Sequence, residues 1–187
     1  MVKVKVIGAG GYGGVGITEL LQGHPEAKLA CLVDTTDVGS PISALYPHLT
    51  GFCDTVIIDP KDPRAQEPVD VVFCATPDGV GMQYAPEILK SGAKLIDYSG
   101  DFRFNTAAAY ADYARRIGRE PTHASPLLLA VSAYGLVELL RGEINQAVDE
   151  ARHLLLVGED LLECRERRGP LRRRLGDGRE ANLPAPL

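Results

Sequence analysis

The feature that most constrains this chain is a glycine cluster placed between its first apolar run and its first helix-like stretch. The cluster reads Gly8-Ala9-Gly10-Gly11-Tyr12-Gly13-Gly14. Val2–Ile7, rich in β-branched residues, predicts a strand before it, and the residues after it predict a helix to about Leu21. A strand, a glycine loop and a helix in this order indicate a phosphate-binding turn, because backbone N–H groups and the positive end of the helix dipole face the anion.

The cluster satisfies two glycine spacings: G-x-G-x-x-G through Gly8, Gly10 and Gly13, and G-x-x-G-x-x-G through Gly8, Gly11 and Gly14. In either spacing the first glycine permits a tight turn, the second admits a pyrophosphate, and the third lets helix and strand pack closely. We expect the cluster, Tyr12 included, to contact a nicotinamide dinucleotide. The alternative is a glycine-rich turn without a ligand.

The second predicted strand, Lys28–Val33, ends at Asp34, where a dinucleotide site needs a group that binds the adenosine ribose. A carboxylate accepts hydrogen bonds from both ribose hydroxyls and repels a 2′-phosphate, so Asp34 favours NAD over NADP. Thr35 beside it offers only a hydroxyl, and no arginine stands near. The alternative is that Asp34 only caps the following turn.

Short apolar runs alternate with helix-like stretches, and the further predicted strands are Thr55–Ile58, Val69–Ala75 and Ala93–Ile96. This alternation indicates right-handed crossovers and a parallel sheet. We therefore expect an α/β fold, a doubly wound parallel sheet of the Rossmann type with an irregular or helical C-terminal tail. The other predicted helices are Gly79–Leu89, Thr106–Gly118 and Val137–Ala147.

The fourth predicted strand closes with Ala75-Thr76-Pro77 at the carboxyl edge of the sheet, where ligands of open α/β sheets bind. We expect Ala75, Thr76 and Pro77 to line the nicotinamide side of the cleft. Asp78 is expected to cap the next helix rather than to act as a catalytic base.

Charge and composition exclude several classes of protein. Twenty basic against 25 acidic residues give a formal net charge of -5, which does not attract nucleic acid or an anionic membrane. No apolar run is long enough to span a membrane or to form a signal peptide, so we expect a cytoplasmic protein. The four cysteines form no C-x-x-C pair, and no metal site is expected. The histidines are expected at the surface or in loops; they are His24, His48, His123 and His153.

Four stretches in this order resemble the N-acetyl-gamma-glutamyl-phosphate reductase family, within the semialdehyde dehydrogenase superfamily. They are the glycine cluster, Val71-Val72-Phe73-Cys74-Ala75-Thr76-Pro77, Leu95-Ile96-Asp97-Tyr98-Ser99-Gly100-Asp101-Phe102-Arg103-Phe104 and Ala133-Tyr134-Gly135-Leu136-Val137-Glu138. The resemblance runs from about Val2 to Ala147, the first half of a family member. It implies NADPH-dependent reduction of an acyl phosphate to a semialdehyde in arginine biosynthesis, through a thioester on a cysteine thiolate.

Departures from the family pattern limit what the resemblance implies. The family's nucleophilic cysteine lies in an Asn-Pro-Gly-Cys-Tyr-Pro-Thr segment that would fall near Leu155, where no such motif stands. Cys164 lies too far on and lacks the Asn-Pro-Gly lead, so we predict no catalytic residue. Asp34 and Thr35 stand where NADP-using members of the family carry a Ser-Arg pair. The resemblance thus implies NADP, whereas the local chemistry favours NAD.

Two residues of the third stretch are candidate substrate ligands. Ser99 and Arg103 follow the fifth predicted strand, and Arg103 can hold the substrate phosphate or a carboxylate by charge-assisted hydrogen bonds. The alternative is that Asp101 and Arg103 bond locally and pin the loop. Tyr134 and Glu138 are expected to orient the other half of an active site.

We expect residues 1–147 to form a dinucleotide-binding domain and residues 148–187 an atypical, arginine-rich and lysine-free tail, partly helical over Val148–Arg168 or disordered. One hypothesis is the cofactor domain of a truncated or frame-shifted reductase, which binds cofactor without turnover and takes an acyl phosphate only if a second domain is supplied. The alternative is a non-catalytic nucleotide-binding module, or half of a split enzyme, that docks on a partner chain. A homo-oligomer is compatible with both.

Overall fold

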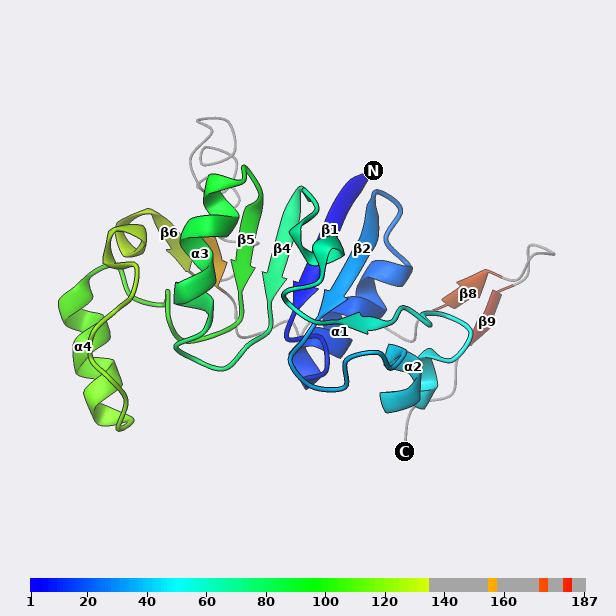
Figure 1. Ribbon diagram of the computed structural model, residues 1–187, viewed down its shortest axis with the longest axis horizontal. Helices are drawn as coiled ribbons and strands as arrows, with labels where there is room; N and C mark the ends of the chain where they lie inside the picture. Colours follow the sequence, from blue (N-terminus) through cyan, green and yellow to red (C-terminus); the bar gives the residue numbers. More distant parts are fainter. Residues whose placement is uncertain (135–154, 158–171, 175–179, 183–187) are drawn as a thin grey trace.

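A parallel sheet of seven strands, in the order β3-β2-β1-β4-β5-β7-β6, organises the computed structural model (Figure 1). Its strands are β1 (Val2–Ile7), β2 (Ala27–Val33), β3 (Ile57–Ile58), β4 (Val71–Cys74), β5 (Lys94–Asp97), β6 (Ser132–Tyr134) and β7 (Leu155–Val157). The chain order reverses between β1 and β4, which are hydrogen-bonded neighbours. The loops that follow these two strands therefore meet at the carboxyl edge of the sheet.

The structure describes residues 1–134, 155–157, 172–174 and 180–182. The predicted helix over Val137–Ala147 lies outside these residues, as do Glu138, His153 and Cys164. Within the last forty residues, β8 (Arg172–Arg174) and β9 (Glu180–Asn182) form a separate antiparallel pair.

The helices are α1 (Tyr12–Gln22), α2 (Ile42–Leu45), α3 (Gly81–Lys90) and α4 (Ala107–Arg116), with 3-10 turns η1 (Pro47–Leu49), η2 (Pro63–Gln66) and η3 (Pro126–Val131). Strand β4 shows how they cover the sheet. Val71 and Phe73 pack in the core cluster that includes α1, whereas Val72 and Cys74 pack in the cluster that includes α3. Because successive side chains of a strand point to opposite faces, α1 and α3 cover opposite faces of the sheet.

The predicted doubly wound parallel sheet is confirmed. β1, α1 and β2 match the predicted segments closely, because their apolar periodicity is long and uninterrupted. The third strand is shorter than predicted: the carbonyl of Thr55 accepts a hydrogen bond from the N–H of Ile42, and Val56 forms an antiparallel bridge with Pro41. The chain therefore joins the parallel sheet only at Ile57.

Residues 155–157 form strand β7 between β5 and β6, where the sequence predicted a helix over 148–168. A run of three apolar residues is too short to show whether its period is that of a strand or of a helix. Its conformation here is set by pairing with β5 and β6.

Within the described residues, we find no helix with the length and apolar character needed to cross a membrane.

Candidate functional site

The glycine cluster forms the turn from β1 into α1. Gly8 has a φ of +80°, and a Cβ at this position would lie 2.4 Å from the carbonyl oxygen of Ala75. Only glycine fits both this left-handed backbone and this contact. The N–H groups of Gly8 and Ala9 donate to the carbonyl of Val33 at 2.9 and 3.3 Å. The turn is thus tied to the end of β2 and packed against the end of β4.

The structure distinguishes between the two glycine spacings. A Cβ at Gly14 would lie 2.2 Å from the carbonyl oxygen of Gly8 and 2.7 Å from the Cα of Ala9, which are backbone atoms. At Gly13 the nearest atom is a ring carbon of Tyr98 at 3.1 Å. Gly14 is therefore the glycine that lets α1 approach β1, and the G-x-x-G-x-x-G spacing describes this turn.

The first turn of α1 presents its amides at the glycine cluster. Gly11 caps the helix: its carbonyl accepts the first intrahelical hydrogen bond, from Val15 at 2.9 Å. The N–H groups of Tyr12, Gly13 and Gly14 precede this bond, so they are the donors that a helix N-terminus offers to an anion.

Asp34, directly after β2, is bonded to the glycine turn. Its Oδ2 accepts the N–H of Gly10 at 2.9 Å. Its Oδ1 accepts the N–H of Thr35 at 2.7 Å, and both the N–H and the hydroxyl of Thr36 at 3.2 Å. The carboxylate therefore lies beside the turn in a fixed orientation, and Oδ2 retains capacity for a second donor.

The residues after β4 lie on the other side of the turn. The N–H of Ala75 donates to the carbonyl of Ile7 at 2.8 Å, which extends the β1–β4 pairing to the edge of the sheet. The methyl carbon of Thr76 would lie 3.1 Å from a Cβ at Gly8. Its hydroxyl oxygen is buried and has no hydrogen-bond partner among the described residues. Pro77 is exposed.

The tertiary structure thus brings most of the predicted cofactor residues to one edge of the sheet. Among the residues that the structure describes, no side chain lies within 4 Å of a Cβ built at Gly11, and the turn presents the first-turn amides of α1 between the Asp34 carboxylate and the β4 loop. These are the donors and the acceptor that suit a pyrophosphate and an adenosine ribose.

The segment after β5 is bonded into the interior. Asp97 is fully buried and accepts the N–H of Ser99 at 3.1 Å and its hydroxyl at 2.7 Å. The Ser99 hydroxyl in turn accepts the N–H of Asp101 at 3.2 Å, so both its donor and acceptor functions are used internally. Burial raises the pKa of Asp97 to about 6, although the bonds from Ser99 oppose the shift. Arg103 is partly buried.

The amides at the N-terminus of α3 are not capped by Asp78, as predicted, but by Asp101. The carboxylate of Asp101 accepts the N–H of Gly79 at 2.7 Å and that of Met82 at 3.1 Å. Asp78 instead accepts the N–H of Gly100 at 2.7 Å. The predicted capping role of Asp78 is wrong, because Asp101, brought in by the β5 loop, supplies the cap. The two aspartates pin the β4 and β5 loops to each other, which favours the local role of Asp101.

His123 lies in a loop, one of the two expected places, and its side chain is buried. Its Nε2 lies 3.0 Å from the carbonyl oxygen of Asp101, and its Nδ1 accepts the N–H of Ser125 at 2.9 Å. The ring packs edge-on against Phe102 and Tyr110. Burial lowers the pKa of His123, so the neutral tautomer with its proton on Nε2 donates to Asp101. This histidine supports the loops; the sequence carried no signal for its burial.

The described cysteines do not offer a nucleophile. Cys31, Cys53 and Cys74 are all buried free thiols. Cys74 lies at the end of β4, near the candidate site, but burial raises the pKa of its thiol far above the ordinary value. A protonated thiol is a poor nucleophile. No cluster of metal ligands occurs within the described residues.

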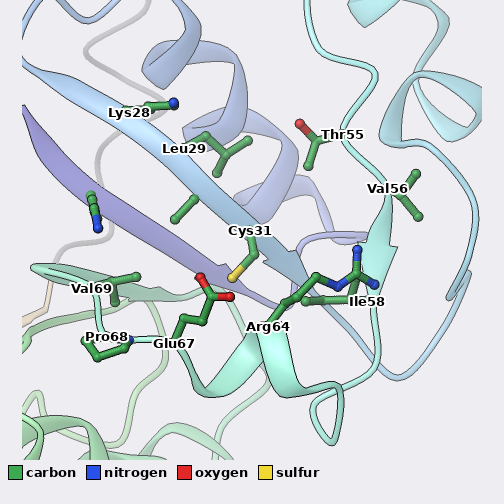
Figure 2. Close-up of a pocket in the computed structure, with 12 residues that line it drawn as sticks. Lys28, Leu29, Cys31, Thr55, Val56, Ile58, Arg64, Glu67, Pro68 and Val69 are labelled. Carbon is green, nitrogen blue, oxygen red and sulfur yellow. The ribbon is translucent and has the colours of Figure 1, made fainter.

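A cavity of about 470 Å³ lies away from the glycine turn, over β2 and β3 (Figure 2). Cys31, from β2, lines it together with Glu67 and Arg64, and burial raises the pKa of this thiol. Arg64 forms a salt bridge with Asp62, with 2.6 Å between Nη2 and Oδ2. The candidate site therefore rests on the glycine turn and Asp34 rather than on this cavity.

The sequence matches the family model described as semialdehyde dehydrogenase, NAD binding domain, over residues 3–147. N-acetyl-gamma-glutamyl-phosphate reductases from Herminiimonas arsenicoxydans and Janthinobacterium sp. are 40% and 41% identical to it over 147 residues. Each alignment covers 79% of this chain and 41% of the relative, so the chain spans about two fifths of the length of these relatives.

Two solved structures share the fold. Aspartate semialdehyde dehydrogenase from Candida albicans, solved with NADP, has a TM-score of 0.52 at 15% identity and covers 83% of this chain and 42% of that one. Aspartate semialdehyde dehydrogenase II from Vibrio cholerae has a TM-score of 0.54 at 16% identity, covering 84% of this chain and 41% of that one.

Proposed function

The chain belongs to the semialdehyde dehydrogenase family through its NAD-binding domain, whose ligand is a nicotinamide dinucleotide, and from this premise we propose that it binds NAD in preference to NADP. The observation that carries this preference is the position of Asp34, whose carboxylate is bonded to Gly10 in the glycine turn. The preference concerns only the ribose end of the cofactor.

In this proposal the amides at the start of α1 hold the pyrophosphate, supported by the helix dipole. Oδ2 of Asp34 accepts a ribose hydroxyl beside its bond to Gly10. A 2′-phosphate at the same place would put like charges within a few ångströms of each other, which costs about 4 kcal/mol per pair of unit charges near a protein surface and less where solvent screens them. Ala75, Thr76 and Pro77 would line the nicotinamide side.

We also propose that residues 1–147 form the cofactor domain and that residues 148–187 are a tail unlike the family. The named relatives are reductases of an acyl phosphate. The sequence has no Asn-Pro-Gly-Cys segment, and Cys74 is held as a thiol. The 187-residue polypeptide by itself is therefore expected to bind the dinucleotide without reducing N-acetyl-gamma-glutamyl phosphate.

Titration with NADH and NADPH tests the proposal. NADH is expected to bind more tightly, and Asp34→Ala should weaken NADH binding about tenfold to a hundredfold, the value of a hydrogen bond to a charged group. NADPH binding should weaken less or improve. Asp59→Ala is the matched control, because Asp59 directly follows β3 and accepts only the local N–H of Lys61 within the described residues.

Tighter binding of NADPH by the unaltered chain would overturn the NAD preference. Binding of neither dinucleotide would overturn the site itself. Equal losses in Asp34→Ala and Asp59→Ala would remove the special role of Asp34.

A second candidate function is a non-catalytic module that docks on a partner chain or on a second copy. Three apolar side chains near β6 favour it: Leu127 is 87% exposed, Val131 45% and Tyr134 44%. Light scattering over a range of concentrations tests self-association, and a constant monomer mass would exclude the second copy.

A further inference from the structure

The peptide group between Gly10 and Gly11 is held at both of its polar ends. Its carbonyl oxygen accepts the hydroxyl of Tyr46 at 2.7 Å, and its N–H, on Gly11, donates to the carbonyl of Gly8 at 3.3 Å. The preceding peptide is held as well, since the N–H of Gly10 donates to Asp34. Tyr46 and Asp34 lie 36 and 24 residues along the chain from Gly10. Two distant side chains therefore fix the middle of the turn.

Tyr46 is itself placed by packed neighbours. Ile42 and Leu49, on either side of it, are 0% and 2% exposed and belong to the core cluster that includes α1. The N–H of Tyr46 donates to the carbonyl of Ile42 at 3.0 Å, and the N–H of Leu49 donates to the carbonyl of Tyr46 at 2.9 Å. The phenol thus reaches the turn from a segment whose backbone is anchored in the core.

The hydroxyl acts as a hydrogen-bond donor across the physiological range of pH. Partial burial raises the pKa of Tyr46, and the nearby Tyr12 and Asp37 add to the shift. The phenol therefore stays protonated, and the Gly10 carbonyl oxygen can only accept.

The orientation of this peptide decides what the turn presents to an anion. Two consecutive glycines have wide conformational freedom, so the Gly10–Gly11 peptide can rotate unless it is held. A rotated peptide would exchange the positions of its carbonyl oxygen and its N–H, and would lose the bond to Gly8. A carbonyl oxygen near the first-turn amides would oppose a pyrophosphate, because its negative end would face the phosphate charge.

We infer that Tyr46 is a positioning residue for the dinucleotide: its hydroxyl holds the Gly10 carbonyl away from the pyrophosphate and keeps the turn in its binding conformation. The inference rests on the proposed function, because it concerns the same site. It assigns to α2 and the residue after it a role in cofactor affinity that the glycine motif alone does not contain.

The variant Tyr46→Phe tests the inference, because it removes the hydroxyl and keeps the ring. Isothermal titration with NADH and with ADP, both of which carry the pyrophosphate, should show Kd values raised about three- to tenfold, the value of one hydrogen bond. Adenosine, which lacks phosphate, should bind within about twofold of its affinity for the unaltered chain by NMR titration. Tyr84→Phe, the same change in α3, is the control and should bind all three ligands unchanged.

Unchanged binding of NADH and ADP by Tyr46→Phe, with binding by the unaltered chain intact, would overturn the inference and leave the proposed function standing. An equal loss for adenosine would also overturn it, since the defect would then be general. If the unaltered chain binds neither NADH nor ADP, the proposed function fails and the inference fails with it.

Amide hydrogen exchange without ligand gives a second readout that does not depend on affinity. Tyr46→Phe should exchange faster at Gly11 while the amides of β1 and β4 keep their rates. Uniformly faster exchange would contradict a positioning role, because it would report loss of global stability.

Discussion

Substituting alanine for Gly14 tests the contact between β1 and α1 on which the candidate site depends. A Cβ at Gly14 would overlap three backbone atoms of the turn: the carbonyl oxygen of Gly8 at 2.2 Å, and the Cα and the carbonyl oxygen of Ala9 at 2.7 and 2.8 Å. Backbone atoms cannot turn aside as a side chain can, so α1 must move away from β1 and take its first-turn amides with it. Gly16 lies in the same helix, and in the described structure no atom lies within 4 Å of a Cβ built there. Gly16→Ala is therefore the matched control.

The expected changes in unfolding free energy have opposite signs. Gly16→Ala should stabilise the protein by about 0.4 to 1 kcal/mol, because alanine favours the helix and restricts the unfolded chain. Overpacking costs about 1 to 3 kcal/mol, and three backbone overlaps put Gly14→Ala at the upper end, for a net loss of about 2 kcal/mol. The variants should thus differ by about 3 kcal/mol, or about 6 to 12 °C in Tm for a chain of this size.

Urea unfolding followed by circular dichroism measures the difference in stability, and NADH titration measures the effect on the site. Gly14→Ala should weaken NADH binding at least about tenfold because the amides are displaced, whereas Gly16→Ala should stay within about twofold. Equal stability of the two variants would refute the reasoning. It would mean that the turn relaxes around the added methyl without moving the helix.

Three further predictions follow from the loops after β4 and β5 and from the buried carboxylates. Asp97→Asn should flatten the pH dependence of stability. Burial raises the folded-state pKa of Asp97 from 3.8 to about 6. The stabilisation that the protonated Asp97 gives the folded state is therefore complete below pH 3.8 and is lost as the pH rises to about 6. The free energy of unfolding should fall by about 3 kcal/mol over this range. Urea unfolding between pH 4 and 7 measures this, and parallel curves for variant and unaltered chain would contradict it. Asp101→Ala should cost about 1 to 3 kcal/mol, because it leaves the N–H groups of Gly79 and Met82 unpaired, whereas Asp112→Ala on the surface of α4 should stay within about 0.5 kcal/mol in the same assay. Gly81→Ala should also destabilise the protein, because the added Cβ would lie 2.6 Å from a carboxylate oxygen of the buried Asp97. A melting temperature equal to that of the unaltered chain would count against the tight packing of α3 on β5.

The strand, glycine turn and helix at the start of the chain could be predicted because their signals are local. β1 and α1 each have a continuous apolar pattern, and the glycines lie between them, so residues 2–22 needed no information from the rest of the chain. The position of Asp34 could be predicted for the same reason, since it directly follows a strand. Its bond to Gly10 could not, because it depends on how β2 aligns with β1.

The capping prediction for Asp78 was wrong because the side chain that caps α3 comes from a distant part of the chain. Asp78 directly precedes the predicted helix Gly79–Leu89, but Asp101 accepts the N–H groups of Gly79 and Met82 from the next loop. His123 shows no local sign of burial, yet the β5 loop and α4 enclose it between Phe102 and Tyr110. The local sequence shows which side chains are able to fill a role such as capping α3. Which of them fills it depends on how the loops pack against one another.

By itself, the sequence determined the order of the strands and helices from β1 to α4, a doubly wound parallel sheet, and the carboxyl edge as the place of the candidate site. These follow from periodicity and connection length, which act over a few residues. Only the tertiary structure decided that Gly14 is the close-packing glycine, that Asp101 caps α3, and that Tyr46 holds the turn. Each of these depends on a contact of a few ångströms between loops, and such contacts exist only once the sheet has brought its loops together.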